Sequence, residues 1–243
     1  MTDSKVLSFT GAFGVAAGVL LLVATPLYLV MGAPPSLGNE TQFAAYVTRS
    51  NTIAIVTKLV DVVYLVGFIV FAAGLRHLIR RVRPDYEWLA ALVFGGALVQ
   101  VASVLMFDAL AGGAALDTFT GPDPGVVRAL TKASLASQVL EFILTAVSYA
   151  ILATRALPRW TGWLGFGIAV LNLLAVPAIF GGSDFMEAVV AGVTSSAGWY
   201  AYINDIRGIA IICWLLIAGI SMMRVKPKVA APMVRERELQ EAG

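Results

Sequence analysis

Six long runs of apolar residues constrain the fold of this chain more than any other feature. Each run approaches the roughly 20 residues that an α-helix needs to cross the hydrocarbon core of a bilayer. The runs cover residues 6–31, 52–75, 88–111, 133–153, 162–181 and 206–223. Because their apolar residues are continuous and do not alternate with polar ones, the runs predict helices rather than the strands of a membrane barrel.

The composition supports the same interpretation. Of the 243 residues, 59% are hydrophobic and 13% are charged, whereas a soluble domain is about 25% charged. So few charges cannot cover the surface of a soluble domain of this size. We therefore predict an all-α, polytopic membrane helix bundle, with residues 1–223 as a single transmembrane domain and residues 224–243 as a basic, flexible cytoplasmic tail.

The net charge and the rare residue types exclude several classes of protein. A net charge of +2 is too small for a nucleic-acid-binding protein. A single histidine, His77, and a single cysteine, Cys213, cannot form a tetrahedral zinc site, a bis-histidine haem site or an intrachain disulfide. The sequence also contains no Walker A, GxSxG or HExxH motif. We expect no metal, no cofactor and no nucleic-acid partner.

The positions of the basic residues predict the orientation in the membrane. Most of the 17 basic residues fall on one side of the six predicted spans, in short turns and near the termini. They are Lys5, Arg76, Arg80, Arg81, Arg83, Arg155, Arg159, Arg224, Lys226, Lys228, Arg235 and Arg237. Loops on the cytoplasmic side of membrane proteins carry an excess of Lys and Arg. We therefore expect both termini to be cytoplasmic and the longer loops to lie outside.

Two of the outer loops contain short amphipathic segments. Within residues 43–47, Phe43, Tyr46 and Val47 share one helical face, and residues 185–193 contain a second such face. We expect both segments to form short helices that lie on the outer face of the membrane. The alternative is a seventh span over residues 185–203, which would move the basic tail outside.

The first predicted span contains two glycines four residues apart, Gly14 and Gly18. Small residues at this spacing allow the backbones of two membrane helices to approach closely. We expect this face to pack against another helix of the same chain rather than against a second copy.

Charged side chains in the predicted spans or near their outer ends are the best candidates for a functional site, because each costs about 2.5–3.5 kcal/mol near the bilayer centre. Lys58, Asp61 and Glu141 are the deepest. Four are basic and four are acidic: Lys58, Asp61, Asp108, Arg128, Lys132, Glu141, Asp205 and Arg207. Lys58 and Asp61 are three residues apart and can pair on one helix face. Glu141 has no basic residue within four positions, so it needs a partner on another helix, a ligand or a proton.

Polar residues follow one face of the fourth predicted span at helical spacing. They are Ser134, Gln138, Glu141, Thr145 and Ser148. Such a stripe must face protein or water rather than lipid. The second and third spans add Tyr64 and Gln100, and the sixth adds Asp205 and Arg207 near its outer end. We therefore predict a polar pocket that opens toward the outside.

The predicted pocket leaves three functions open. The first is an accessory, sensor or ligand-binding membrane protein, with the lipid bilayer and a small solute or lipid as partners. The second is a proton-coupled transporter of a small solute, in which Glu141 is the proton site and Asp61 and Lys58 gate the pocket. A homodimer would suit so small a transporter.

The third function is an enzyme that acts on a lipid or isoprenoid through a buried carboxylic acid. The acid would be Asp61, Glu141 or Asp108, with Tyr64 and Phe68 in the pocket wall. A purely structural interpretation is the alternative to all three, since polar groups within membranes often do no more than hydrogen-bond one helix to another.

The turn between the fourth and fifth predicted spans carries the motif Leu157-Pro158-Arg159-Trp160, followed by Gly162-Trp163-Leu164-Gly165. With the six-span layout, this turn resembles a family of uncharacterised bacterial six-helix membrane proteins. The resemblance extends over most of the chain and implies a location in the bacterial inner membrane. That family has no established activity, so the resemblance implies no catalytic residue.

Overall fold

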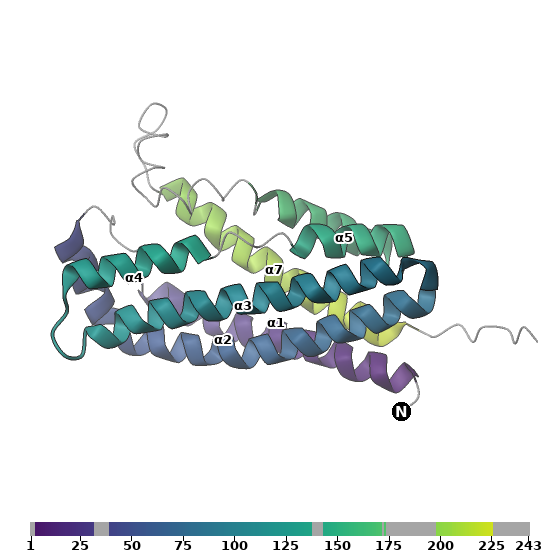
Figure 1. Cartoon of the computed structure of the whole chain (residues 1–243), viewed down its shortest axis with the longest axis horizontal. Coiled ribbons are helices and arrows are strands. Elements are labelled where there is room, and N and C mark those ends of the chain that lie inside the picture. Colours follow the sequence, from purple (N-terminus) through teal and green to yellow (C-terminus); the bar gives the residue numbers. More distant parts are fainter. Residues whose placement is uncertain (1–2, 32–38, 138–142, 172, 174–197, 226–243) are drawn as a thin grey trace, which may run out of the picture.

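The computed structural model describes residues 3–31, 39–137, 143–171, 173 and 198–225, and all regular structure within these ranges is helical (Figure 1). Within these ranges, three helices are long and apolar enough to cross a membrane: α1 (Asp3–Met31), α2 (Glu40–Val82) and α3 (Glu87–Asp117). The others are a short 3-10 helix (Pro84–Tyr86), α4 (Pro124–Ser137), α5 (Ile143–Thr154), a helix over residues 159–171, and α7 (Gly198–Arg224). The prediction of an all-helical chain with long apolar helices is confirmed.

The fourth and fifth predicted spans are covered only in part. The fourth, residues 133–153, comprises the end of α4, residues 138–142, which lie outside the described residues, and α5. The fifth is described as far as residue 173, apart from residue 172, and the sixth lies within α7. The second amphipathic segment, most of the alternative seventh span and the basic tail lie outside the described residues.

Helix α2 is one continuous helix of 43 residues, about 64 Å long at 1.5 Å per residue. It is therefore about twice as long as the hydrocarbon core is thick. Asn39 caps the helix by accepting a hydrogen bond from the backbone N–H of Gln42 (3.1 Å), and no glycine or proline follows before Gly67. The prediction that residues 43–47 form a separate helix on the membrane face is wrong, because they are the first turns of α2.

The start of α2 packs against the end of α3 and against α4, and so its apolar face is covered by protein. A small apolar cluster joins the three helices and consists of Phe43, Ala114 and Val127, with Val47 and Leu130 beside them. Arg128 of α4 forms an ion pair with Glu40. The Asn51 side-chain amide donates a hydrogen bond to the Thr118 hydroxyl (3.1 Å). These contacts explain why the amphipathic segment needs no membrane surface.

The helices run back and forth along one long axis (Figure 1). The start of α1, the turn between α2 and α3, the turn after α5 and the end of α7 all lie at the same end of the bundle. We call it the basic end, after the Lys and Arg residues that these segments carry: Lys5, Arg76, Arg80, Arg81, Arg83, Arg155, Arg159 and Arg224. The loop between α3 and α4, residues 118–123, lies at the opposite end.

Helix α1 packs between α2 and α7 through its glycines. A Cβ atom at Gly14 would lie 2.5 Å from the Phe71 ring of α2, and one at Gly18 would lie 2.8 Å from a side chain of α7. Nearer the basic end, a Cβ atom at Gly11 would lie 2.8 Å from the Gly219 carbonyl oxygen. The predicted close-packing role of Gly14 and Gly18 within the chain is confirmed.

The main apolar core joins α1, α2, α3, α5, the helix over residues 159–171 and α7. Trp214 of α7 is 2% exposed, and its indole N–H donates a hydrogen bond to the Thr161 carbonyl (3.0 Å). The buried Ser148 leaves room only for a glycine at position 165, where a Cβ atom would lie 2.2 Å from the serine hydroxyl. Arg155 ends α5 in the left-handed conformation (φ 54°), which is common just beyond a helix C-terminus.

Candidate functional site

Two carboxylates from different helices share one lysine in the interior of the bundle. Lys58 Nζ of α2 lies 3.1 Å from Asp61 Oδ2 on the same helix and 2.8 Å from Asp108 Oδ1 on α3. The Lys58, Asp61 and Asp108 side chains are 15%, 10% and 5% exposed. The ammonium group also lies 4.5 Å from the ring centroid of Phe107, within the range of a cation–π contact. The predicted Lys58–Asp61 pair is confirmed, and we call Lys58, Asp61 and Asp108 the Lys58 cluster.

Helix geometry explains how Asp108 comes to join the pair. Lys58 lies 24 residues before Val82, the last residue of α2, and Asp108 lies 21 residues after Glu87, the first residue of α3. Because the two helices are antiparallel around a tight turn and rise equally per residue, these positions come to nearly the same height. Asp108 also lies nine residues before Asp117, the end of α3, and not near the end of its helix as the predicted span boundaries had it.

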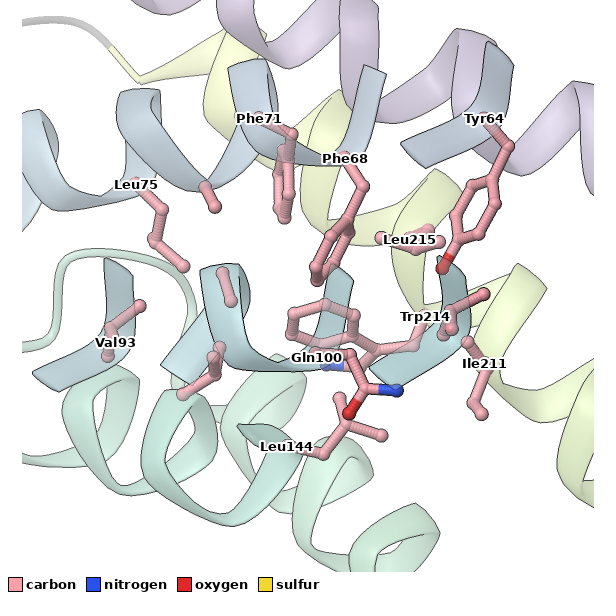
Figure 2. Close-up of a pocket in the computed structure, with 14 residues that line it drawn as sticks. Tyr64, Phe68, Phe71, Leu75, Val93, Gln100, Leu144, Ile211, Trp214 and Leu215 are labelled. Carbon is pink, nitrogen blue, oxygen red and sulfur yellow. The ribbon is translucent and has the colours of Figure 1, made fainter. Parts of the chain in front are cut away.

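A cavity of about 100 Å³ lies about one helical turn from the Lys58 cluster, toward the basic end (Figure 2). It is lined by residues of α2, α3, α5 and α7. Tyr64, three residues beyond Asp61, and Val104, four residues before Asp108, mark its side nearest the cluster. The principal side chains of the wall are Tyr64, Phe68, Phe71, Gln100, Leu144 and Trp214.

Aromatic rings form a large part of this wall. Phe71 and Trp214 meet edge to face, with ring centroids 6.2 Å apart and planes at 87°. Tyr64 and Phe68 are also 6.2 Å apart, with their planes at 42°. Figure 2 shows Tyr64, Phe68 and Phe71 projecting from α2 toward the other helices of the pocket. A wall of this kind favours an apolar occupant, and rings most of all.

The described part of the wall is more apolar than the pocket that the sequence predicted. Of the predicted site residues, Tyr64 and Gln100 line the pocket, whereas Lys58, Asp61 and Asp108 do not. The charged residues instead bind one another one turn away, because an ion that leaves water needs an opposite charge beside it. Ion pairing and the pocket are therefore separate features of the same helices.

Several predicted residues lie outside the described part of the chain. Glu141 and Gln138 are among them, and the side chains of Asp205 and Arg207 on α7 are not described either. Their roles stay predictions, as do proton-coupled transport and lipid chemistry. Transport and lipid chemistry both depend on these residues or on proton exchange at the Lys58 cluster.

The described part of the polar stripe on the fourth predicted span has mixed surroundings. Ser148 is fully buried, and its hydroxyl donates to the Leu144 carbonyl (2.5 Å), one turn earlier on the same helix. Thr145 is exposed. A serine that bonds to its own helix needs no polar partner elsewhere, so Ser148 can sit in an apolar core.

Sequence reasoning identified Tyr64, Phe68 and Gln100 but missed Trp214, which closes the pocket from α7. The available signal was a lone tryptophan within an apolar span, since a buried indole N–H needs an acceptor. That acceptor is the Thr161 carbonyl, 53 residues away in the chain, and it belongs to the first turn of the helix over residues 159–171, whose position only the fold determines.

In the described residues, the fold and the site consist of helices, three of them long and apolar enough to cross a membrane, with a mainly apolar cavity between helices. No family model, no curated protein and no solved structure matches this chain. The resemblance of the Leu157–Trp160 turn to bacterial six-helix proteins therefore stays a prediction, and the function is inferred from the chemistry of the pocket.

Proposed function

We propose that this chain is an integral membrane protein that binds a compact, mainly apolar molecule in the pocket between α2, α3, α5 and α7. The observation that carries the proposal is the cavity itself, about 100 Å³ among aromatic and aliphatic side chains. Protein interiors are close-packed and contain few voids larger than a water molecule. A dry cavity of about 150 Å³ is large enough to hold benzene in an engineered protein, so an occupant with a single ring is of the right order of size.

Trp214 provides the test, because it is buried in the pocket wall. A variant that keeps only this tryptophan carries Trp88→Phe, Trp160→Phe, Trp163→Phe and Trp199→Phe. When the protein is reconstituted in lipid nanodiscs, bromobenzene should quench Trp214 fluorescence with a saturable dependence on concentration, because a bromine atom in the pocket would contact the indole. A variant that keeps only the exposed Trp163 should show unsaturable quenching from bromobenzene dissolved in the lipid.

Filling the cavity supplies a matched control. Ala97→Leu places a larger side chain in the pocket wall, whereas Ala91→Leu adds the same atoms to the exposed side of α3. The Trp214 quenching should lose its saturable component in the first variant and keep it in the second. Unsaturable quenching in the parent protein, or saturable quenching that survives Ala97→Leu, would contradict the proposal.

We also propose that the chain has six spans with both termini in the cytoplasm of a bacterium, and that it resides in the inner membrane. The gathering of basic residues at one end of the bundle supports this orientation, since Lys and Arg are concentrated on the cytoplasmic side of membrane proteins. The apolar helices α1, α2 and α3 support membrane insertion.

Cysteine labelling tests the orientation. In a Cys213→Ser background, Thr120→Cys places a thiol in the loop opposite the basic end and Arg155→Cys places one at the basic end; both native side chains are exposed. A membrane-impermeant maleimide should label Thr120→Cys in intact cells and Arg155→Cys only after permeabilisation. The reverse pattern would invert the orientation, and labelling of both sites in intact cells would rule out the six-span arrangement.

A further inference from the structure

We infer that the pocket selects molecules that carry a hydrogen-bond donor on an aromatic ring, as a phenol does, and that the side-chain oxygen of Gln100 accepts this hydrogen bond. The inference rests on the proposed binding function and specifies its ligand. Gln100 lies on α3 in the wall of the pocket and is 8% exposed. Its Oε1 atom is buried and has no hydrogen-bond partner among the described residues.

A buried acceptor without a partner is costly. The large majority of buried side-chain polar atoms in proteins are hydrogen-bonded, because leaving one unpaired forfeits the bond that it would make with water. In a bundle made mostly of aliphatic helices, a leucine or methionine at position 100 would avoid this cost. A ligand donor that pairs with Oε1 would recover the lost hydrogen bond when it binds.

The described residues of the wall do not supply that donor. Trp214 has one N–H group, and it donates to the Thr161 carbonyl. Backbone N–H groups of α2, α3, α5 and α7 within the wall bond along their own helices. The Tyr64 hydroxyl is the other side-chain donor in the wall, and it does not reach Oε1, which has no partner. Since no donor for Oε1 remains among the described residues of the wall, we assign the missing donor to an occupant of the pocket.

The surroundings of Gln100 indicate the rest of the ligand. Figure 2 shows its amide beside Trp214 and Leu144, with Phe68 above Trp214 in this view. A planar ring can pack edge to face against Trp214 and Phe68. Rotation about the terminal bond of a glutamine side chain is soft, so Oε1 can turn toward a donor on that ring.

Two probes of similar shape test the inference in the variant that keeps only Trp214. Bromobenzene and 4-bromophenol both quench a neighbouring indole, but only the phenol carries a donor. The dissociation constants of the two probes are measured with Gln100 and with Gln100→Met, which keeps the length of the side chain without its oxygen. The phenol preference of a protein is its dissociation constant for bromobenzene divided by that for 4-bromophenol. Dividing the preference measured with Gln100 by the preference measured with Gln100→Met cancels the unequal partitioning of the two probes into lipid.

The phenol preference should be about fivefold larger with Gln100 than with Gln100→Met, as expected for one hydrogen bond. An equal preference in both proteins would overturn the inference and leave the binding function standing. Absence of saturable quenching by both probes would overturn the binding function itself. If Gln100→Met fails to fold, the parent protein is instead tested with 4-bromoanisole, in which the donor is methylated. After correction for partitioning into lipid, 4-bromoanisole should bind more weakly than 4-bromophenol. Equal affinity for the two probes would overturn the inference.

Discussion

The Gly219→Ala variant is expected to unfold with a free energy about 1–3 kcal/mol lower than that of the parent protein. A Cβ atom at position 219 would lie 2.8 Å from the Gly11 carbonyl oxygen and 2.9 Å from the Val15 backbone nitrogen. Both are backbone atoms of α1, so a change of side-chain rotamer cannot relieve the clash. Helices α1 and α7 would have to separate, and the packing on either side of the contact would loosen.

Gly95→Ala is the matched control, because a Cβ atom at position 95 of α3 meets nothing within 4 Å. Alanine is a better helix former than glycine by about 1 kcal/mol, so this variant should be slightly more stable than the parent. Unfolding in mixed detergent, followed by circular dichroism, measures both. Equal stability changes in the two variants would show that α1 and α7 do not meet backbone to backbone. Gly11→Ala should behave like Gly219→Ala.

The Lys58→Met variant is expected to lose about 3–5 kcal/mol of stability, which is the usual cost of removing one partner from a buried ion pair. Lys58 stands between the Asp61 and Asp108 carboxylates at 3.1 and 2.8 Å. Without the ammonium group, two acidic groups from α2 and α3 would face each other in surroundings that hydrate them poorly. Methionine fills most of the volume, so the loss reports on charge rather than on packing.

Neutralising the carboxylates should restore most of that loss. The triple variant Lys58→Met, Asp61→Asn, Asp108→Asn removes every charge of the cluster and is expected to be much more stable than Lys58→Met alone. Lys5→Met, at an exposed position of α1, controls for the general loss of one positive charge. If Lys58→Met unfolds like the parent, or if the triple variant gains nothing over it, the cluster does not link α2 to α3 by ion pairing.

Structural features that depend on residues close together in the chain could be predicted from the sequence. Long apolar runs predicted α1, α2 and α3, and a spacing of three residues predicted the Lys58–Asp61 pair. The spacing of Gly14 and Gly18 predicted close helix packing. Each of these follows from the period of the α-helix and from the cost of placing polar groups in hydrocarbon, which act on any chain in the same way.

Features that join distant segments were decided by the tertiary structure. Asp108 reaches Lys58 only because α2 and α3 are antiparallel and place these two residues at the same height along the bundle. The start of α2 continues the helix because α3 and α4 cover its apolar face, a cover that no local pattern reveals. The pocket and the unpaired Gln100 oxygen arise where four helices fail to fill the space between them. Hydropathy and spacing act along one helix, whereas a cavity depends on the shapes of side chains from several helices at once.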